Sequence, residues 1–152
     1  MQKITPFLWF DTQGEEAMKF YTQVFKDSEI ISVNKLPDGQ MMTGEFKIHG
    51  QRLMVLNAGP QFKFNEAISL FVNCADQAEV DELWEKLTDD GGQESRCGWL
   101  KDKFGLSWQI IPKALGELMG DPDIEKSQRV MQAMMKMGKI VVADLQAAYD
   151  GK

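Results

Sequence analysis

The order of expected secondary-structure elements repeats once along the chain, and this repeat constrains the fold more than any single motif. Residues 4–58 show a strand, an amphipathic helix and three further strands, and residues 66–112 show a strand, a helix and hairpin strands. Each half has an aspartate after its first strand and a glycine before its last strand: Asp11, Asp76, Gly50 and Gly105. The sequence therefore predicts an α+β fold of two βαβββ units, about 1–58 and 66–112, in one module over residues 1–112.

Local signals define the elements within each unit. Residues 4–10 form a mostly apolar run in which neither set of alternating positions is polar. This predicts a strand buried on both faces. The His49-Gly50 pair between two β-rich runs predicts a hairpin turn, with His49 in solvent. Asp76 and Glu79 are spaced to cap the second helix. Residues 93–100 are expected to form a strand with a kink where Cys97 precedes Gly98-Trp99.

Residues 113–152 are expected to form a helical extension. Pro112 ends the last strand, and Asp121-Pro122-Asp123 separates a short helix at 114–119 from a longer helix at 125–137, with a further helix at 140–149. The methionines of the middle helix suit a surface that covers the chain's own sheet or a partner subunit. A partner helix bound by these methionines is the alternative.

The composition limits the functional class. Lys and Arg number 17 against 23 Asp and Glu, a net charge of −6, which argues against nucleic-acid and acidic-membrane partners. No apolar run approaches the roughly 18–20 residues of a membrane span, and no signal peptide is expected. Two cysteines are too few for a disulfide framework, so we expect a cytoplasmic protein. With His49 as the single histidine, the chain lacks the parts for a Ser-His-Asp or multi-histidine zinc site.

Several segments together resemble one protein family. They are residues 4–10, Glu16-Ala17 with Phe20-Tyr21, Gly44-Glu45-Phe46 with Gly50-Gln51, residues 62–69, residues 97–109, and the tail Asp121-Pro122-Asp123 with Val130, Met131, Met134 and Met137. The pattern resembles the vicinal oxygen chelate superfamily, which includes glyoxalase I, ring-cleaving dioxygenases and fosfomycin and bleomycin resistance proteins. It is most similar to the PhnB-like branch, often labelled 3-demethylubiquinone-9 3-methyltransferase.

The resemblance implies a glyoxalase-like fold in which curved mixed sheets form a cup. Chelating relatives hold a divalent metal there, with ligands from the first and last strand of each half. Approximate alignment places these positions near Ile4, Met54, Ser69 and Gln109. Only Gln109 among them is a possible ligand, and one neutral amide does not hold a divalent cation against water. We therefore expect no metal.

The methyltransferase label is not supported by a nucleotide-binding motif. The first strand is followed by a single glycine, Gly14, and two carboxylates, without the glycine-rich turn that a doubly wound nucleotide fold uses. We therefore expect no cofactor.

A cup without a metal is still a pocket, and such sites are mostly apolar with a few polar groups. The candidate ligand-binding residues are Trp9, Asn57, Phe62, Phe64, Trp99, Trp108 and Gln109. Lys101 or Gln109 would orient a planar or apolar small molecule. The alternative for each aromatic side chain is that it fills the core.

Three residues are candidates for catalysis. Cys97, Trp99 and Lys101 share one face if the strand is regular, which would place a thiol near an ammonium group. The alternative is an inert thiol, which we favour, as we do for Cys74. Glu45 is a candidate general base if its side chain points inward, although outward exposure is favoured.

The sequence thus predicts a metal-independent, PhnB-like protein that binds a small molecule in an aromatic-lined cup, with catalysis left open. One alternative is a binding protein that sequesters a toxic ligand, as resistance proteins of this superfamily do. Another is an enzyme of the same fold, either metal-dependent (a lyase or a dioxygenase-like enzyme) or the methyltransferase of the family label. A homodimer is expected from the resemblance.

Overall fold

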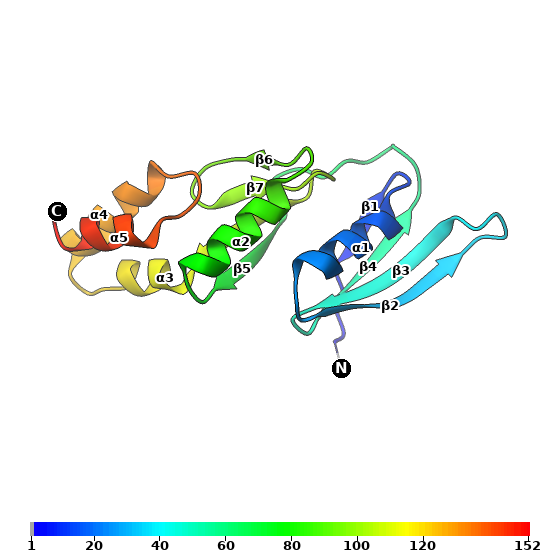
Figure 1. The fold of residues 1–152 in the computed structure, drawn as a ribbon, viewed down its shortest axis with the longest axis horizontal. Coiled ribbons are helices and arrows are strands. Elements are labelled where there is room, and N and C mark those ends of the chain that lie inside the picture. The colour runs from blue at the N-terminus through cyan, green and yellow to red at the C-terminus, as the bar shows by residue number, and fades with distance from the viewer. Residues whose placement is uncertain (1) are drawn as a thin grey trace. The chain divides into compact units, whose positions relative to one another are not determined.

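A computed structural model describes residues 2–152 of the chain. The chain divides into two compact units, Met1–Phe64 and Asn65–Lys152. Each unit contains a four-stranded mixed sheet, and the strand order is the same in both (Figure 1). This confirms the predicted α+β fold with a duplicated βαβββ topology.

The first unit has the strand order β1-β4-β3-β2, in which β1 runs parallel to β4 and the other neighbours are antiparallel. Its elements are β1 (Phe7–Phe10), α1 (Gly14–Val24), β2 (Ser28–Lys35), β3 (Met41–Ile48) and β4 (Gln51–Asn57).

The second unit repeats this arrangement as β5-β8-β7-β6, with β5 parallel to β8. Its sheet and covering helix are β5 (Ser69–Cys74), α2 (Gln77–Thr88), β6 (Gln93–Glu94), β7 (Trp99–Lys101) and β8 (Ser107–Pro112). The predicted cap of α2 is confirmed, because Asp76 accepts the N–H of Glu79 at 2.9 Å. The Glu79 carboxylate accepts the N–H of Ala75 at 2.8 Å.

Each helix covers one face of its own sheet. In the first unit, the aromatic rings of Tyr21 and Phe46 stack with centroids 5.7 Å apart, and both side chains are fully buried. We call the face of each sheet opposite its covering helix, α1 or α2, the open face. Phe7 on β1 is 51% exposed, so the prediction that this strand is buried on both faces was wrong. β1 is an edge strand and pairs with β4 in the sheet.

The predicted hairpin turn at His49-Gly50 is confirmed. Both residues have positive φ, 46° and 80°, which is typical of the two-residue turn that joins twisted antiparallel strands. The His49 side chain is half-exposed, and its Nδ1 lies 3.5 Å from a carboxylate oxygen of Asp27.

The expected strand at residues 93–100 is broken in the structure. β6 ends at Glu94 and β7 begins at Trp99, and between them Cys97 and Gly98 both have positive φ. The backbone N–H of Cys97 donates to Met137 O at 2.8 Å. A contact with the C-terminal extension therefore replaces the strand ladder at this point.

The C-terminal helices belong to the second unit. They are α3 (Lys113–Met119), α4 (Ile124–Met135) and α5 (Val142–Tyr149). They pack around the end of β8 in a buried apolar cluster of Ile111, Leu115, Val130, Ile140 and Leu145. Within residues 2–152, no helix combines the length and the apolar character needed to cross a membrane.

Candidate functional site

Polar side chains gather on the open face of the second sheet. Residue pairing across the strands places Lys101 opposite Ser107, and Ser107 opposite Ser69. Leu100 and Trp108, which alternate with them, are buried in the core. Because side chains alternate along a strand, Lys101, Ser107 and Ser69 form one row across β7, β8 and β5 on the open face.

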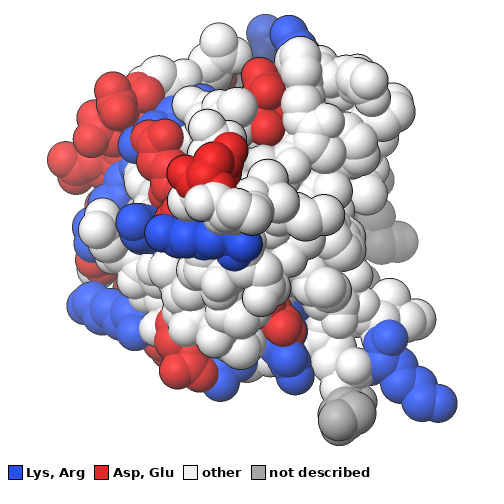
Figure 2. All heavy atoms as spheres, turned by 90° about the vertical axis from the view of Figure 1, so that its right-hand side faces the viewer, with Lys and Arg blue, Asp and Glu red and all other residues white. Residues whose placement is uncertain are grey.

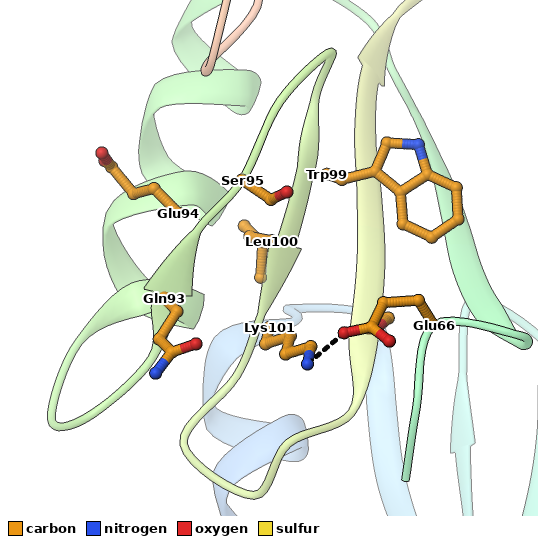
Figure 3. A pocket seen from close by; sticks show the side chains of 8 residues that line it. Glu66, Gln93, Glu94, Ser95, Trp99, Leu100 and Lys101 are labelled. Carbon is orange, nitrogen blue, oxygen red and sulfur yellow. Dashed lines mark ion pairs between the residues drawn. The ribbon is translucent and has the colours of Figure 1, made fainter.

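A pocket of about 180 Å³ lies at the Lys101 and Ser107 end of this row, and Ser69 adjoins Ser107 outside its lining. Its lining is mostly polar, with Trp99 as the aromatic side chain: Glu66, Gln93, Glu94, Ser95, Trp99, Leu100, Lys101 and Ser107. Figure 3 shows the indole of Trp99 and the carboxylate of Glu66 on the same side of β8, the pale yellow strand. The pocket is therefore built by the second unit alone.

The Lys101 ammonium group forms an ion pair with the Glu66 carboxylate (Figure 3). The hydrogen bond from Lys101 holds the pKa of Glu66 below its ordinary value. The Glu66 side chain is 60% exposed and precedes β5 in the chain. An ion pair this exposed contributes little to folding stability, because water competes for both charges.

The hydroxyl of Ser107 is unusual because it is both buried and unpaired. Ser107 is only 1% exposed, and its Oγ has no hydrogen-bond partner within residues 2–152. Buried hydroxyls are normally hydrogen-bonded, since desolvation without a partner costs free energy. The neighbouring carboxylate of Glu94 is already used, because it accepts Trp84 Nε1 at 2.7 Å.

The strand ladders explain why space remains beside Ser107. Phe7 pairs with Met54 and Phe71 pairs with Gln109, and each of these residues lies three positions before the C-terminal end of its strand. Arg52 in the first sheet is therefore the equivalent of Ser107, and it lies opposite Lys47 as Ser107 lies opposite Lys101. The guanidinium of Arg52 crosses this position and donates from Nε to Glu45 at 2.6 Å.

The residues at the expected metal positions do not fit a divalent cation. The ladder assigns Thr5, rather than Ile4, to the position equivalent to Ser69, and the other two positions hold Met54 and Gln109. Gln109 donates from Nε2 to Ser69 Oγ at 2.9 Å. No group of three or more His, Cys, Asp or Glu side chains in the described part of the chain is placed to hold a metal.

Of the predicted ligand-binding residues in the second unit, Trp99 lines the pocket, together with the catalytic candidate Lys101. Gln109 lies next to Trp99 on the open face. Trp108 is buried on the helix-covered face, where its Nε1 donates to Asp102 at 2.9 Å. Cys97 precedes β7 with φ of 58°, so it does not continue the alternation of Trp99 and Lys101.

The other predicted ligand-binding residues belong to the first unit. Trp9 donates from Nε1 to Gly59 O at 2.9 Å and meets the Phe62 ring edge-on, while Phe64 packs against Phe10. The amide of Asn57 is fully engaged with backbone groups.

Glu45, the candidate base, lies on the open face of the first sheet. Its side chain is 19% exposed and paired with Arg52. The Glu45 side chain is therefore less exposed than the outward-pointing arrangement that we favoured from the sequence.

The sequence analysis missed Ser107 and Glu66. A signal for Ser107 existed, because Ser107 and Gln109 alternate with Trp108 and Ile110 along one strand. This alternation indicates a polar face opposite an apolar one. Glu66 lies in a loop and has no comparable signal.

Charged side chains of both signs are interspersed on the molecular face in Figure 2.

Comparison with known proteins identifies the family. Residues 2–111 match the family described as 3-demethylubiquinone-9 3-methyltransferase. The chain belongs to this family. The predicted PhnB-like resemblance is thereby confirmed, and no curated protein matches this PhnB-like chain.

One solved structure supports the same family, and two more distant ones share its fold. The PhnB protein from Bacillus cereus is 35% identical, with a TM-score of 0.69 over 73% of this chain and 99% of its own. Protein PA1353 from Pseudomonas aeruginosa is 21% identical, with a TM-score of 0.59 over 74% and 98% of the two chains. The fosfomycin resistance protein FosX from Listeria monocytogenes shares the fold at 16% identity, with a TM-score of 0.56 over 76% and 94%. The PhnB-like chain thus has the glyoxalase-like fold of the vicinal oxygen chelate superfamily.

Proposed function

We propose that this chain binds a small planar organic molecule in the pocket beside Trp99, without a metal ion. The observation that carries the proposal is the pocket of about 180 Å³ on the open face of the second sheet. An apolar cavity of ~150 Å³ holds benzene, whereas drug-sized ligands occupy roughly 300–1,000 Å³. The ligand portion that enters this pocket is therefore about the size of one substituted ring.

The donor set supports metal independence. The positions that carry ligands in chelating relatives hold Thr5, Met54, Ser69 and Gln109, and Ser69 and Gln109 are hydrogen-bonded to each other. Hard divalent cations prefer several charged oxygen ligands, and borderline cations prefer imidazole or thiolate. Binding should therefore be the same before and after treatment with a strong chelator.

Amide NMR spectra recorded during titration with small ring compounds, both charged and neutral, test the proposal. The largest shifts are expected at the pocket residues Ser95, Trp99, Leu100 and Lys101. Ser107→Arg should abolish them by filling the pocket, and Gln128→Arg at an exposed position of α4 is the control. Shifts confined to Trp9 and Phe62, or their survival in Ser107→Arg, would refute this site.

The same samples separate a binding protein from an enzyme. A sequestering protein returns its ligand chemically unchanged after long incubation, and an enzyme converts it. We propose the binding role, because the pocket's single ammonium group is already paired with Glu66 rather than with a nucleophile. Detection of a product by mass spectrometry would instead favour an enzyme.

We also propose that the chain is a homodimer. The support is the large exposed apolar side chains on the sheet of the first unit, which include Phe7, Ile31 and Met42. Phe7 and Ile31 lie on β1 and β2, the two edge strands of this sheet, and exposed apolar side chains are common on interaction surfaces. Sedimentation equilibrium should give the dimer mass, and a monomer at all concentrations would contradict the proposal.

A further inference from the structure

We infer that Lys101, Ser107 and Ser69 form an oxyanion subsite that holds the carboxylate of a small planar acid, and that Glu66 competes for this subsite. The inference rests on the proposed function, because it assigns a ligand class to the same pocket. It specifies the charge of the ligand, which the presence of a pocket alone does not determine.

The three side chains are adjacent donors on one surface. Lys101 and Ser107 are directly opposite each other across β7 and β8, and Ser107 and Ser69 are directly opposite across β8 and β5. Directly opposite residues on antiparallel strands have Cβ atoms roughly 4.5–5.5 Å apart. A carboxylate beside Lys101 is therefore close to Ser107, whose enclosed Oγ it reaches once a neighbouring side chain moves aside.

The hydrogen-bond inventory favours an acceptor as the missing partner. The Ser69 oxygen accepts from Gln109 Nε2 at 2.9 Å, which leaves its own hydrogen to donate. The buried Ser107 hydroxyl has no partner in the described chain, and Lys101 has only donor hydrogens. All three groups are satisfied at once by a negatively charged oxygen group, which accepts several hydrogen bonds.

Glu66 already occupies part of this subsite as an internal carboxylate. Its ion pair with Lys101 shows that a carboxylate fits beside this ammonium group. Since Glu66 is 60% exposed, its side chain loses little contact when it turns into solvent. A ligand carboxylate that also reaches the Ser107 hydroxyl makes a hydrogen bond that is absent from the Glu66 arrangement.

Both carboxylates that line the pocket, Glu66 and Glu94, already have partners, so they do not attract a cationic ligand as unpaired charges would. Lys101 is the only cationic side chain among the eight lining residues, all of which lie in the described part of the chain. The Glu94 carboxylate accepts the Trp84 indole N–H, and in Figure 3 it points away from Lys101. A positively charged ligand would have to approach the Lys101 ammonium group, which repels it.

The indole of Trp99 defines the shape of the rest of the ligand. It lies beside Glu66 on the same side of β8 (Figure 3). A flat ring attached to the carboxylate can lie against this indole, because aromatic faces and edges pack favourably. Benzoate is therefore a suitable probe, and benzamide, which has the same shape without the charge, is its control.

The experiment is an amide NMR titration of the full-length chain with benzoate and with benzamide. Benzoate should bind with a dissociation constant on the order of 1 mM, typical of a fragment, and benzamide roughly tenfold more weakly or worse. Lys101→Met and Ser107→Ala should each weaken benzoate binding, by about tenfold for Lys101, whereas benzamide binding stays the same. Glu66→Gln should strengthen benzoate binding severalfold, because the competing carboxylate is gone.

Lys47→Met is the matched control, because Lys47 holds the equivalent position in the first sheet and pairs with Glu29 at 2.8 Å. It should leave benzoate binding unchanged. Equal binding of benzoate and benzamide at the pocket, insensitive to Lys101→Met and Glu66→Gln, would overturn the oxyanion subsite and leave the pocket intact. If neither probe shifts the pocket resonances, the proposed function itself fails together with this inference.

Discussion

The side-chain oxygen of Asn57 accepts the N–H of Gly14 at 2.8 Å and thereby ties the end of β4 to the start of α1. The nitrogen of the same amide donates to the carbonyls of Thr12 and Met41. Asn57→Ala should therefore lower the free energy of unfolding by about 2 kcal/mol, because it leaves three backbone groups without a partner. Urea denaturation measures this change.

Asn34→Ala is the control for this variant. Asn34 is exposed on the edge strand of the same sheet and donates to the Thr43 hydroxyl at 3.0 Å. Its removal should change stability by less than about 0.5 kcal/mol. If the two variants were equally stable, the bonds of Asn57 would not hold α1 in place.

Two glycines in helices should respond to alanine in opposite directions. A Cβ on Gly14 would lie 2.6 Å from Val55 Cγ1 and from Met41 Cε, so Gly14→Ala should destabilise the chain by about 1–3 kcal/mol. Gly116 in α3 has nothing within 4 Å of the same position, so Gly116→Ala should stabilise the chain by about 0.5–1 kcal/mol. Thermal unfolding of both variants checks the signs, and a stabilised Gly14→Ala would contradict the close packing described here.

Asp102 organises the turn between β7 and β8. Its buried carboxylate accepts the backbone N–H groups of Phe104 and Leu106 and the indole N–H of Trp108, at 2.9, 3.1 and 2.9 Å. Asp102→Asn exchanges one acceptor oxygen for an amide donor that faces another donor, and it should cost about 2–3 kcal/mol in chemical denaturation. Asp38→Asn is the control: the carboxylate of Asp38 also accepts a turn N–H but is exposed, and an equal loss there would exclude burial as the cause.

The two thiols should differ in reactivity. Cys74 is fully buried, whereas Cys97 is partly exposed. Iodoacetamide should therefore modify one thiol in the folded chain near neutral pH and both thiols in denaturant, as counted by mass spectrometry. The modification should disappear in Cys97→Ser and persist in Cys74→Ser, and the reverse pattern would contradict the burial of Cys74.

Cys74 also predicts a dependence of stability on pH. Burial, together with the nearby carboxylates of Glu79 and Asp76, raises the pKa of this thiol to about 12. An unfolded thiol loses its proton near pH 8.5, so above that pH the unfolded chain binds fewer protons than the folded chain. The free energy of unfolding should therefore fall as the pH rises above about 8.5, by at most about 1.4 kcal/mol per unit. Denaturation of Cys74→Ala at the same pH values should show a shallower decline, and identical slopes would refute the shift.

Features that depend on local chemistry were predictable from the sequence. The turn at His49-Gly50 follows from a β-rich run on each side and a glycine at the required position. The cap at Asp76 follows from its spacing to Glu79. The duplicated element order follows from the hydrophobic pattern, because both units use the same strand and helix periods.

Features that depend on distant residues were not predictable. At the strand break before β7, Cys97 N–H bonds to Met137, a residue far along the chain. Gly98 is also packed closely against a distant residue, since a Cβ there would lie 2.5 Å from Ile111 Cδ1. The space beside Ser107 requires that neighbouring strands place small side chains together, which no single segment of sequence records.

The exchange of Arg52 for Ser107 between the two repeats has a wider consequence. In a duplicated fold, each position in one repeat can be compared with the equivalent position in the other repeat, where a different residue packs in the same surroundings. In the first repeat Arg52 binds Glu45 at this position, and in the second repeat the short side chain of Ser107 lines a pocket. One copy can thus preserve the scaffold while the other diverges toward recognition, and the specificity of the chain can change without any change in its topology.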